Sequence, residues 1–245
     1  MEFSIRPLGD KAIQILFISP ISEKLNRHIQ HTANAIKSKH ILGIIEVVPA
    51  FETLTVYYEP MKISHTALVE KLHSICSAPS NKNRVYQKEI VTIPVCYGNR
   101  FGEDLPHVAK HNNLTEQEVV SLHCSKQYLV YLIGFLPGFP YLKGLSQKLH
   151  TPRLAEPRLK VPRGSVGIGG DQTGVYPIES PGGWNLIGQT PLTLFNPTSP
   201  SPFLIKAGDF IRFVSISETE FYEITQAVKE NKYVVKREVI QNEED

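Results

Sequence analysis

Three segments rich in glycine and proline read YLVYLIGFLPGFPYL at residues 128–142, TPRLAEPRLKVPRGSVGIGG at 151–170 and DQTGVYPIESPGGWNLIGQTPLTLFNP at 171–197. Between Gly134 and Pro191 lie 8 of the chain's 18 prolines and 11 of its 16 glycines. Proline fixes φ and removes a backbone donor, whereas glycine supplies positive φ and lets backbones approach closely. Because apolar residues and the single Trp are interspersed with these turns, the stretch predicts short strands and tight turns, where binding sites are commonly built.

The composition of the 245 residues is that of a soluble globular chain, with 41% hydrophobic and 20% charged residues. A net charge of +2 without a Lys/Arg block argues against nucleic acid or membrane as a partner. Met1 is followed by Glu2 and the strand-like FSIRPLG rather than by the apolar core of a signal peptide, which predicts a cytoplasmic protein. The three cysteines form no CxxC motif and indicate reduced thiols rather than a disulfide framework or a zinc site.

The N-terminal third predicts a small α+β domain over residues 1–84. Ser22 and Ser64 precede helical patterns and are suited to cap them. The polar run at residues 78–84 is the best candidate for a domain boundary. Alternating apolar residues predict four strands, at 3–9, 12–18, 41–50 and 52–60. With the two helices, the order of elements is ββαββα, which predicts one sheet with helices on one face.

Residues 85–245 predict a closed or nearly closed β-barrel with a helical insertion. QKEIVTIPVCY at 87–97 is a strand, and Thr115 with Glu118 forms a capping box that opens a helix after another short one at 101–113. Beyond Tyr128 nearly everything alternates as strand and turn, and AGDFIRFVSIS at 207–217 predicts the arm of a final hairpin.

Histidines give the first candidates for chemistry. His123 shares the apolar face of its predicted helix with Val119 and Val120, so it is either a core residue or a general base. The pairs His28/His31 and His107/His111 have helical metal-ligand spacing but lack a third ligand, which predicts that they bind no metal.

Two common motifs fail in the glycine-rich segment. The run from Gly164 to Gly170 is not GxGxxG, is followed by strand-like sequence and lacks a Walker lysine. Arg163 stands where a GxSxG nucleophile elbow needs its first glycine. The sequence therefore contains no self-contained kinase, dehydrogenase or serine-hydrolase site.

After these exclusions, the remaining candidates for a functional site are cationic and amide side chains beside glycine turns. Arginine binds carboxylate or phosphate through two parallel hydrogen bonds, and glycine turns present backbone N–H groups to anions. Each arginine alone could be a surface charge, but together with Trp184 they indicate a site for an anion or acyl group. The set comprises Arg153, Arg158, Lys160, Arg163, Gln172 and the turn Ser180–Trp184.

The aromatic residues between 128 and 141 mostly alternate as core positions of a strand. The turn Leu136–Phe139 is the exception, because it could present Phe139 as the lip of a groove or as a protein-binding knob.

Three motifs together resemble a bacterial family: GFLPGFPYL, then PRLAEPRLKVPRGSVGIGG, then TGVYPIESPGGWNLIGQTPLTLFNP. That family comprises the B component of 5-oxoprolinase, allophanate hydrolase subunit 1 and the sporulation-kinase inhibitor KipI. The resemblance implies a ferredoxin-like α/β sandwich followed by a cyclophilin-like β-barrel. The chain departs from the family pattern at Lys143 and Arg163, which add charge beside the expected groove.

The resemblance implies one component of a multi-subunit, ATP-dependent 5-oxoprolinase, which opens 5-oxo-L-proline to L-glutamate; the chain is expected to be inactive alone. Its expected partners are the C component of 5-oxoprolinase, which is biotin-dependent-carboxylase-like, and the A component. ATP with Mg²⁺ would be bound by, or shared with, a partner. The alternatives are an inhibitor that blocks autophosphorylation of a sensor histidine kinase, with Phe139 as a contact, and an allophanate or urea-pathway subunit.

The resemblance also assigns expected roles to single residues. His123 and Arg158 are the expected catalytic residues. The expected substrate-binding residues are Arg153, Gln172, Tyr176, Ser180, Gly182, Gly183 and Trp184.

Overall fold

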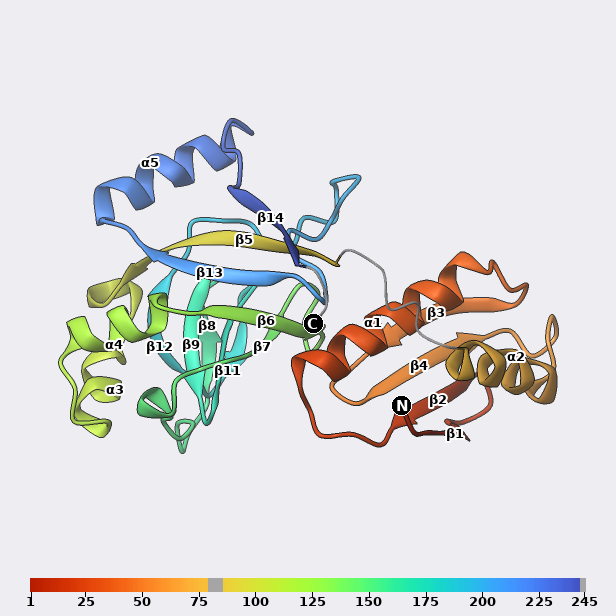
Figure 1. Ribbon diagram of the computed structural model, residues 1–245. Coiled ribbons are helices and arrows are strands. Elements are labelled where there is room, and N and C mark those ends of the chain that lie inside the picture. The colour runs from red at the N-terminus through yellow and green to blue at the C-terminus, as the bar shows by residue number, and fades with distance from the viewer. Residues whose placement is uncertain (79–85, 243–245) are drawn as a thin grey trace. The chain divides into compact units, whose positions relative to one another are not determined.

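The computed structural model describes residues 1–78 and 86–242 and divides into two compact units, Met1–Arg84 and Val85–Glu243 (Figure 1). The expected boundary run at 78–84 lies, apart from Ala78, outside the described residues. No helix in the described ranges is long and apolar enough to cross a membrane.

The first unit is one antiparallel sheet with strand order β1-β2-β4-β3 and two helices. This order and the ββαββα sequence are those of a ferredoxin-like sandwich whose last strand has moved to the front. The two-domain α+β prediction is confirmed. The elements are β1 (Phe3–Pro7), β2 (Ala12–Phe17), α1 (Glu23–Ser38), β3 (Ile44–Pro49), β4 (Thr53–Tyr58) and α2 (His65–Ser77).

Both helices of this unit begin where the sequence predicts. The Ser22 hydroxyl accepts the backbone N–H of Leu25, and the Ser64 hydroxyl accepts that of Ala67. A side-chain oxygen at this position satisfies one of the backbone donors that a helix leaves unpaired. Alternate residues of β2 and β4 pack with the apolar faces of the helices into one core, which includes Ile13, Ile15, Leu25, Leu54, Val56 and Leu68.

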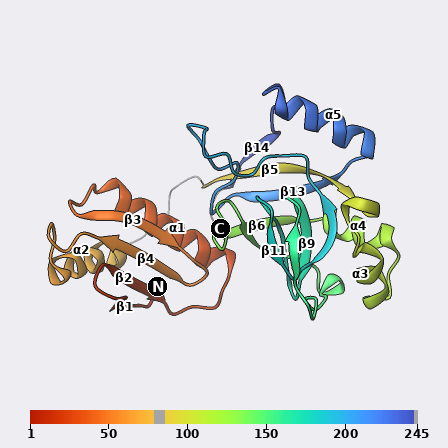
Figure 2. The same ribbon diagram turned by 180° about the vertical axis from the view of Figure 1, so that it is seen from behind.

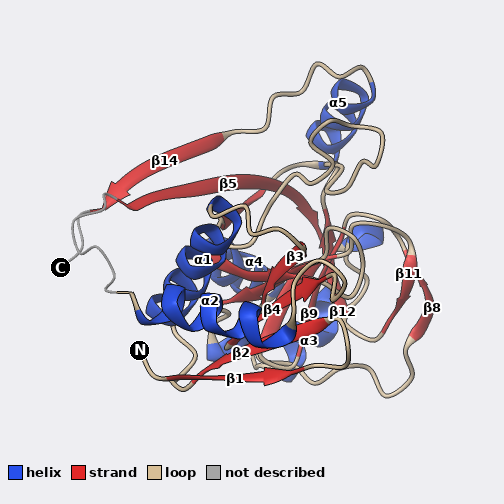
Figure 3. Ribbon diagram, turned by 90° about the vertical axis from the view of Figure 1, so that its right-hand side faces the viewer, coloured by secondary structure: helices blue, strands red, loops and turns tan. Residues whose placement is uncertain are grey.

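The second unit is a closed barrel of seven strands. The strand order β12-β9-β10-β7-β6-β13-β5 closes on itself because β12 also pairs with β5. Strands β8 and β11 form a separate two-stranded ribbon (Figure 3). The strands are β5 (Tyr86–Tyr97), β6 (Gln127–Ile133), β7 (Pro140–Lys143), β8 (Arg158–Val161), β9 (Ser165–Gly169), β10 (Gln172–Val175), β11 (Ser180–Gly182), β12 (Asn185–Gln189), β13 (Phe210–Ser215) and β14 (Arg237–Asn242).

Strand β5 pairs with three other strands. Strand β14 pairs with its first half, β12 pairs with Cys96 and Tyr97 at its end, and β13 runs parallel along its other edge. The expectation that residues 207–217 form a hairpin arm is therefore wrong. Strand β13 pairs in parallel with β5, although more than a hundred residues separate the two strands in the sequence. The alternation of apolar residues within one strand cannot show which distant strand it pairs with.

A helical insertion joins β5 to β6, as the sequence predicts. Figures 1 and 2 show α3 and α4 together at the end of the barrel where β5 ends. The predicted capping box is present, because Thr115 and Glu118 bond each other's backbone N–H groups. The helical elements are η1 (Asn99–Phe101), α3 (Leu105–His111), α4 (Glu116–Cys124), η2 (Gln147–Leu149) and α5 (Glu218–Lys229).

The two faces of β9 differ in a way that positions the candidate site. Val166 and Ile168 point into the main barrel core. Gly167 and Gly169 alternate with them and therefore lie on the outer face. A second, smaller aromatic cluster covers this outer face, and it comprises Phe139, Val161, Tyr176, Trp184 and Leu186.

Candidate functional site

Trp184 lies against a strip of glycines on the outer face of the barrel. A Cβ atom added at Gly169 of β9 would lie 2.4 Å from Trp184 Cδ1, and one at Gly174 of β10 would lie 3.1 Å from Cζ3. A side chain at Gly169 would displace the indole, and one at Gly174 would require it to move by a few tenths of an ångström. Part of the glycine richness of this stretch therefore serves to seat one aromatic ring.

Phe139 and Tyr176 pack around Trp184. The ring of Phe139 meets that of Trp184 edge-on at 5.6 Å between centroids, and that of Tyr176 at 5.4 Å. The Tyr176 hydroxyl lies over Gly182, where an added Cβ would be 2.4 Å from the oxygen. Burial raises the pKa of Tyr176, against the opposing effects of the Trp184 backbone and of Arg153, so the hydroxyl stays protonated near neutral pH.

Arg153 is held above this cluster with its charge available. Its guanidinium lies over the Trp184 ring, 5.8 Å from the ring centroid. The backbone beside it is anchored, because the N–H of Leu154 donates to the carbonyl of Gly183 at 2.7 Å. Among the described residues no carboxylate forms an ion pair with Arg153. An exposed cation on an aromatic face, without a carboxylate partner, can accept an anionic ligand.

Arg158 is bound to carboxylates of its own chain. Its Nη2 donates to Asp104 Oδ1 at 2.8 Å, its Nε lies 2.9 Å from Glu103 Oε1, and its Nη1 lies 3.4 Å from the carbonyl oxygen of Trp184. Burial alone would lower the pKa of Arg158, but the hydrogen bonds and charges of Asp104 and Glu103 raise it. The guanidinium is thus a permanently charged link between the ribbon and the segment after β5.

Asp104 is a residue of this site that sequence reasoning missed. Its second oxygen, Oδ2, accepts the backbone N–H of Leu186 at 2.6 Å, so one carboxylate joins Arg158 of β8 to β12. The available signal was the acidic pair Glu103–Asp104 within the helical segment predicted at 101–113. A partner 54 positions away cannot be identified from that signal.

Gln172 and Ser180 lie on the margins of the cluster. Gln172 is directly opposite Gly169 in the antiparallel pair β9–β10, so its side chain shares the face on which Trp184 packs. Ser180 pairs with Val161 at the far end of the ribbon, and its buried hydroxyl has no hydrogen-bond partner among the described residues. The structure therefore brings together Arg153, Arg158, Tyr176, Gly182, Gly183 and Trp184, with Gln172 and Ser180 at the edges and Phe139 beneath.

The prediction that Phe139 projects from its turn is wrong. Phe139 is 2% exposed and packs beneath Trp184, whereas Phe135 is 67% exposed. The backbone explains the difference: Phe135 has φ of 64°, and the N–H of Leu136 bonds the carbonyl of Gly134 at 2.7 Å. A tight turn centred on a residue with positive φ reverses the chain and exposes the side chain at its tip.

His123 lies inside the barrel, on the other side of β10 from Trp184. Its Nδ1 is 2.7 Å from the Tyr97 hydroxyl, and its Nε2 is 2.9 Å from Thr173 Oγ1. Thr173 lies between Gln172 and Gly174 in the strand, so its side chain points to the opposite face. The structure thus does not bring His123 together with the two arginines.

Hydrogen bonds also fix the tautomer of His123. Thr173 donates its hydroxyl hydrogen to the carbonyl of Gly167, so it must accept from His123 Nε2, and Nδ1 then accepts from Tyr97. Burial lowers the pKa of His123 to about 3, which keeps the ring neutral. The ring also stacks on Phe213 at 4.5 Å. These contacts are those of a satisfied core histidine, and a catalytic role for it stays a prediction.

The described residues lack two features that commonly mark a metal or phosphate site. No group of three or more His, Cys, Asp and Glu side chains among them could hold a metal ion. The glycine run at 164–170 leads into β10 rather than into a helix, so it lacks the helix N-terminus on which phosphate-binding loops rely.

Comparison with known proteins confirms the resemblance read from the motifs. A family model described as carboxyltransferase domain, subdomain C and D, matches residues 3–205. The chain is 42% identical to the B component of 5-oxoprolinase of Bacillus subtilis (strain 168), over 91% of this chain and 96% of that protein.

Solved structures show the same fold. The structure of the protein TTHA0988 matches with a TM-score of 0.74 and 36% identity, over 85% of this chain and 40% of that one, so the present chain spans less than half of that relative. Urea amidolyase of K. lactis matches with a TM-score of 0.80 over 98% of this chain and 16% of that one, and at 20% identity this likeness concerns the fold.

Proposed function

This chain belongs to the family of carboxyltransferase domains, subdomain C and D, and on that basis we propose that it is the B component of an ATP-dependent 5-oxoprolinase. The complex adds water across the lactam C–N bond of 5-oxo-L-proline and releases L-glutamate, with hydrolysis of ATP. Support comes from the 42% identity to a protein of that name, which extends over nearly its whole length.

The observation that carries the proposal is the position of Arg153. Its guanidinium lies on the face of Trp184 without a carboxylate partner among the described residues. 5-Oxo-L-proline combines a carboxylate with a small flat ring. In the proposed complex the carboxylate binds Arg153 through paired hydrogen bonds, and the ring lies beside the aromatic cluster.

The other residues have complementary parts in this proposal. The Gln172 side chain, on the same face, is suited to hydrogen-bond the lactam amide. The protonated Tyr176 hydroxyl is a donor beside the Gly182–Gly183 turn. Arg158 acts as a positioning residue through Asp104, because its donors are engaged with its own chain; direct catalysis by Arg158 stays a prediction.

The remaining chemistry belongs to partners in this proposal. The C component, which resembles biotin-dependent carboxylases, and the A component complete the enzyme. In this proposal ATP with Mg²⁺ is bound by a partner or shared with one. We assign the protein to the cytoplasm, in keeping with free Cys76, Cys96 and Cys124.

Reconstitution tests the proposal. The A and C components from the same genome are mixed with this chain, and 5-oxoproline-dependent release of ADP and glutamate is measured. We expect a stable complex whose activity disappears when this chain is omitted. A complete trio that leaves 5-oxoproline unchanged would refute the proposal.

The same preparations separate the alternatives. Turnover of allophanate or urea instead of 5-oxoproline would assign the chain to the urea pathway. Loss of autophosphorylation by a purified sensor histidine kinase would support the inhibitor function. The buried position of Phe139 removes one candidate contact of the inhibitor alternative, while Phe135 of the same turn is exposed.

A further inference from the structure

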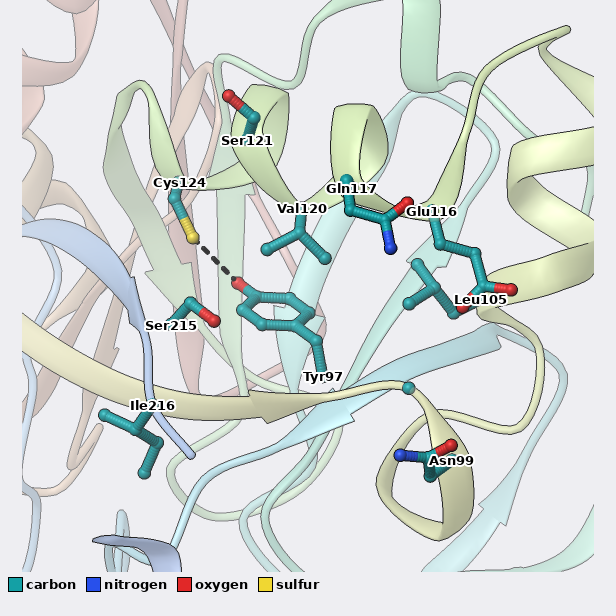
Figure 4. Close-up of a pocket in the computed structure, with 11 residues that line it drawn as sticks. Tyr97, Asn99, Leu105, Glu116, Gln117, Val120, Ser121, Cys124, Ser215 and Ile216 are labelled. Atoms are coloured by element: carbon teal, nitrogen blue, oxygen red, sulfur yellow. Dashed lines mark hydrogen bonds between the residues drawn. The ribbon is translucent and has the colours of Figure 1, made fainter. Parts of the chain in front are cut away.

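A cavity of about 630 Å³ opens on the barrel unit where β5 ends, and it shares no residue with the Trp184 site (Figure 4). Its wall consists of the end of β5 and the turn after it, the start of α3, helix α4 and the residues at the end of β13. Small-molecule sites commonly have volumes of roughly 300–1,000 Å³. The size is therefore that of a site for a small ligand.

The wall combines an apolar floor with a polar rim. The ring of Tyr97 lies at the centre, with Val120 above it and Ile216 to one side (Figure 4). Asn99 and Ser121 add neutral polar groups. Such a mixture binds the apolar body of a ligand on the floor and orients its polar end at the rim.

Glu116 supplies the charge of this cavity. Of the residues lining it, all of which the structure describes, Glu116 alone carries a charge. No ion pair or hydrogen bond of its side chain is found among the described residues, whereas Arg100, beside the cavity, is paired with Glu218. A Cβ added at Gly98 would lie 3.8 Å from Glu116 Oε2, so the carboxylate stands over the turn that follows β5. The cavity is thus negative and its carboxylate is available.

The floor is preorganised by buried hydrogen bonds. The Tyr97 hydroxyl lies 2.7 Å from His123 Nδ1, and the thiol of Cys124 donates to it at 3.5 Å. Burial raises the pKa of Tyr97 well above its ordinary value, so the ring stays neutral. A fixed, neutral aromatic face attracts cations.

We propose that this cavity binds a small organic cation, an ammonium group on an apolar body, with the cation between Glu116 and the face of Tyr97 and the body against Val120 and Ile216. In this proposal a charged hydrogen bond and a cation–π contact act on the same group. The inference is independent of the proposed enzyme function, because none of these residues belongs to the Trp184 site.

Benzylammonium and benzoate test the proposal, since they share a ring and differ in the sign of their charge. The readouts on the full chain are backbone NMR shifts and the rate at which iodoacetamide alkylates Cys124, which lines the cavity while Cys76 and Cys96 are buried. We expect benzylammonium to shift the signals of Gly98, Asn99 and Ser121 and to slow alkylation of Cys124, and benzoate to do neither.

Glu116→Gln provides the decisive variant. Glu116 is exposed at the start of α4, so the neutral isostere leaves the fold intact. We expect it to weaken benzylammonium binding about tenfold, the effect of one charge-assisted contact. Glu223→Gln, an exposed position on α5 outside the cavity, should leave binding unchanged. Equal binding of benzoate, no binding of benzylammonium, or full affinity in Glu116→Gln would each overturn the proposal.

Discussion

Arg158 and Asp104 form the hydrogen bond that joins the outer ribbon to the barrel, with 2.8 Å between Nη2 and Oδ1. The same carboxylate accepts the N–H of Leu186 at 2.6 Å, so it links β8, β12 and the start of α3. With 13% of its side chain exposed, Asp104 is largely withdrawn from water. A carboxylate in this position supports the site chiefly by fixing where its parts lie.

Removal of that carboxylate should destabilise the barrel unit. Asp104→Ala leaves the N–H of Leu186 without its acceptor and takes one of the two carboxylates from Arg158, and we expect a loss of about 2–3 kcal/mol in the free energy of unfolding. Urea denaturation measures this loss. Glu103→Ala is the matched control, because the Glu103 side chain is 60% exposed and should cost no more than about 0.5 kcal/mol. Equal losses of unfolding free energy in the two variants would show that the Asp104 carboxylate does not stabilise the barrel unit more than the exposed Glu103.

A methyl group at Gly169 should displace the indole of Trp184. The added Cβ would lie 2.4 Å from Cδ1, so Gly169→Ala should cost about 1–3 kcal/mol by overpacking. Trp184 is the chain's single tryptophan, so its fluorescence emission should also shift. Gly183→Ala, where the added atom would lie 3.5 Å from Pro157, should leave the emission unchanged. An unaltered spectrum in Gly169→Ala would mean that the glycines do not seat the ring.

The buried imidazole of His123 should make the fold sensitive to acid. Burial lowers its pKa to about 3 in the folded chain, against about 6.5 when unfolded. Its contribution to stability is complete above pH ~6.5 and is lost progressively as the pH falls toward 3, because the unfolded chain takes up the proton first. Urea midpoints between pH 7 and 5 should fall less steeply in His123→Gln than in the exposed control His111→Gln. Identical slopes would contradict the buried, neutral ring.

Asp209 should have the opposite dependence on pH. Burial raises its pKa to about 6, although the Lys206 backbone and charge oppose the shift. The folded chain therefore holds this proton more tightly, and the stabilisation is complete below pH ~3.9 and lost as the pH rises through about 6. Asp209→Asn should gain about 1 kcal/mol relative to the native chain between pH 5 and 7.5, measured by urea denaturation. Asp171→Asn, at an exposed turn, should gain nothing. A constant difference across this pH range would rule out a raised pKa for Asp209.

Local signals made most of the secondary structure predictable. Ser22 and Ser64 cap their helices, and Thr115 with Glu118 forms its capping box, because these interactions span only a few residues. Closure of the barrel was expected in outline, but the strands that close it could not be named. The parallel pair β5–β13 and the contact of β12 with β5 depend on packing of distant segments.

The sequence predicted which residues belong to the site, but it could not predict which of them contact one another. The motifs pointed to Arg153, Tyr176 and Trp184, which the structure places together. No local pattern could show that Arg158 is bound to Asp104 while Arg153 has no carboxylate partner in the described part of the chain. That difference arises from side chains 54 positions apart, which only the folded chain brings into contact.

The most direct test of the account is the kcat/KM for 5-oxoproline of the reconstituted complex containing Arg153→Ala. Loss of one arginine–carboxylate contact should lower kcat/KM about 100-fold, while assembly and the free energy of unfolding stay unchanged, because Arg153 is exposed. Arg6→Ala, an exposed arginine of the first unit, should retain native turnover. A complex with Arg153→Ala that matches the Arg6→Ala complex within about twofold would contradict the assignment of this surface as the substrate site.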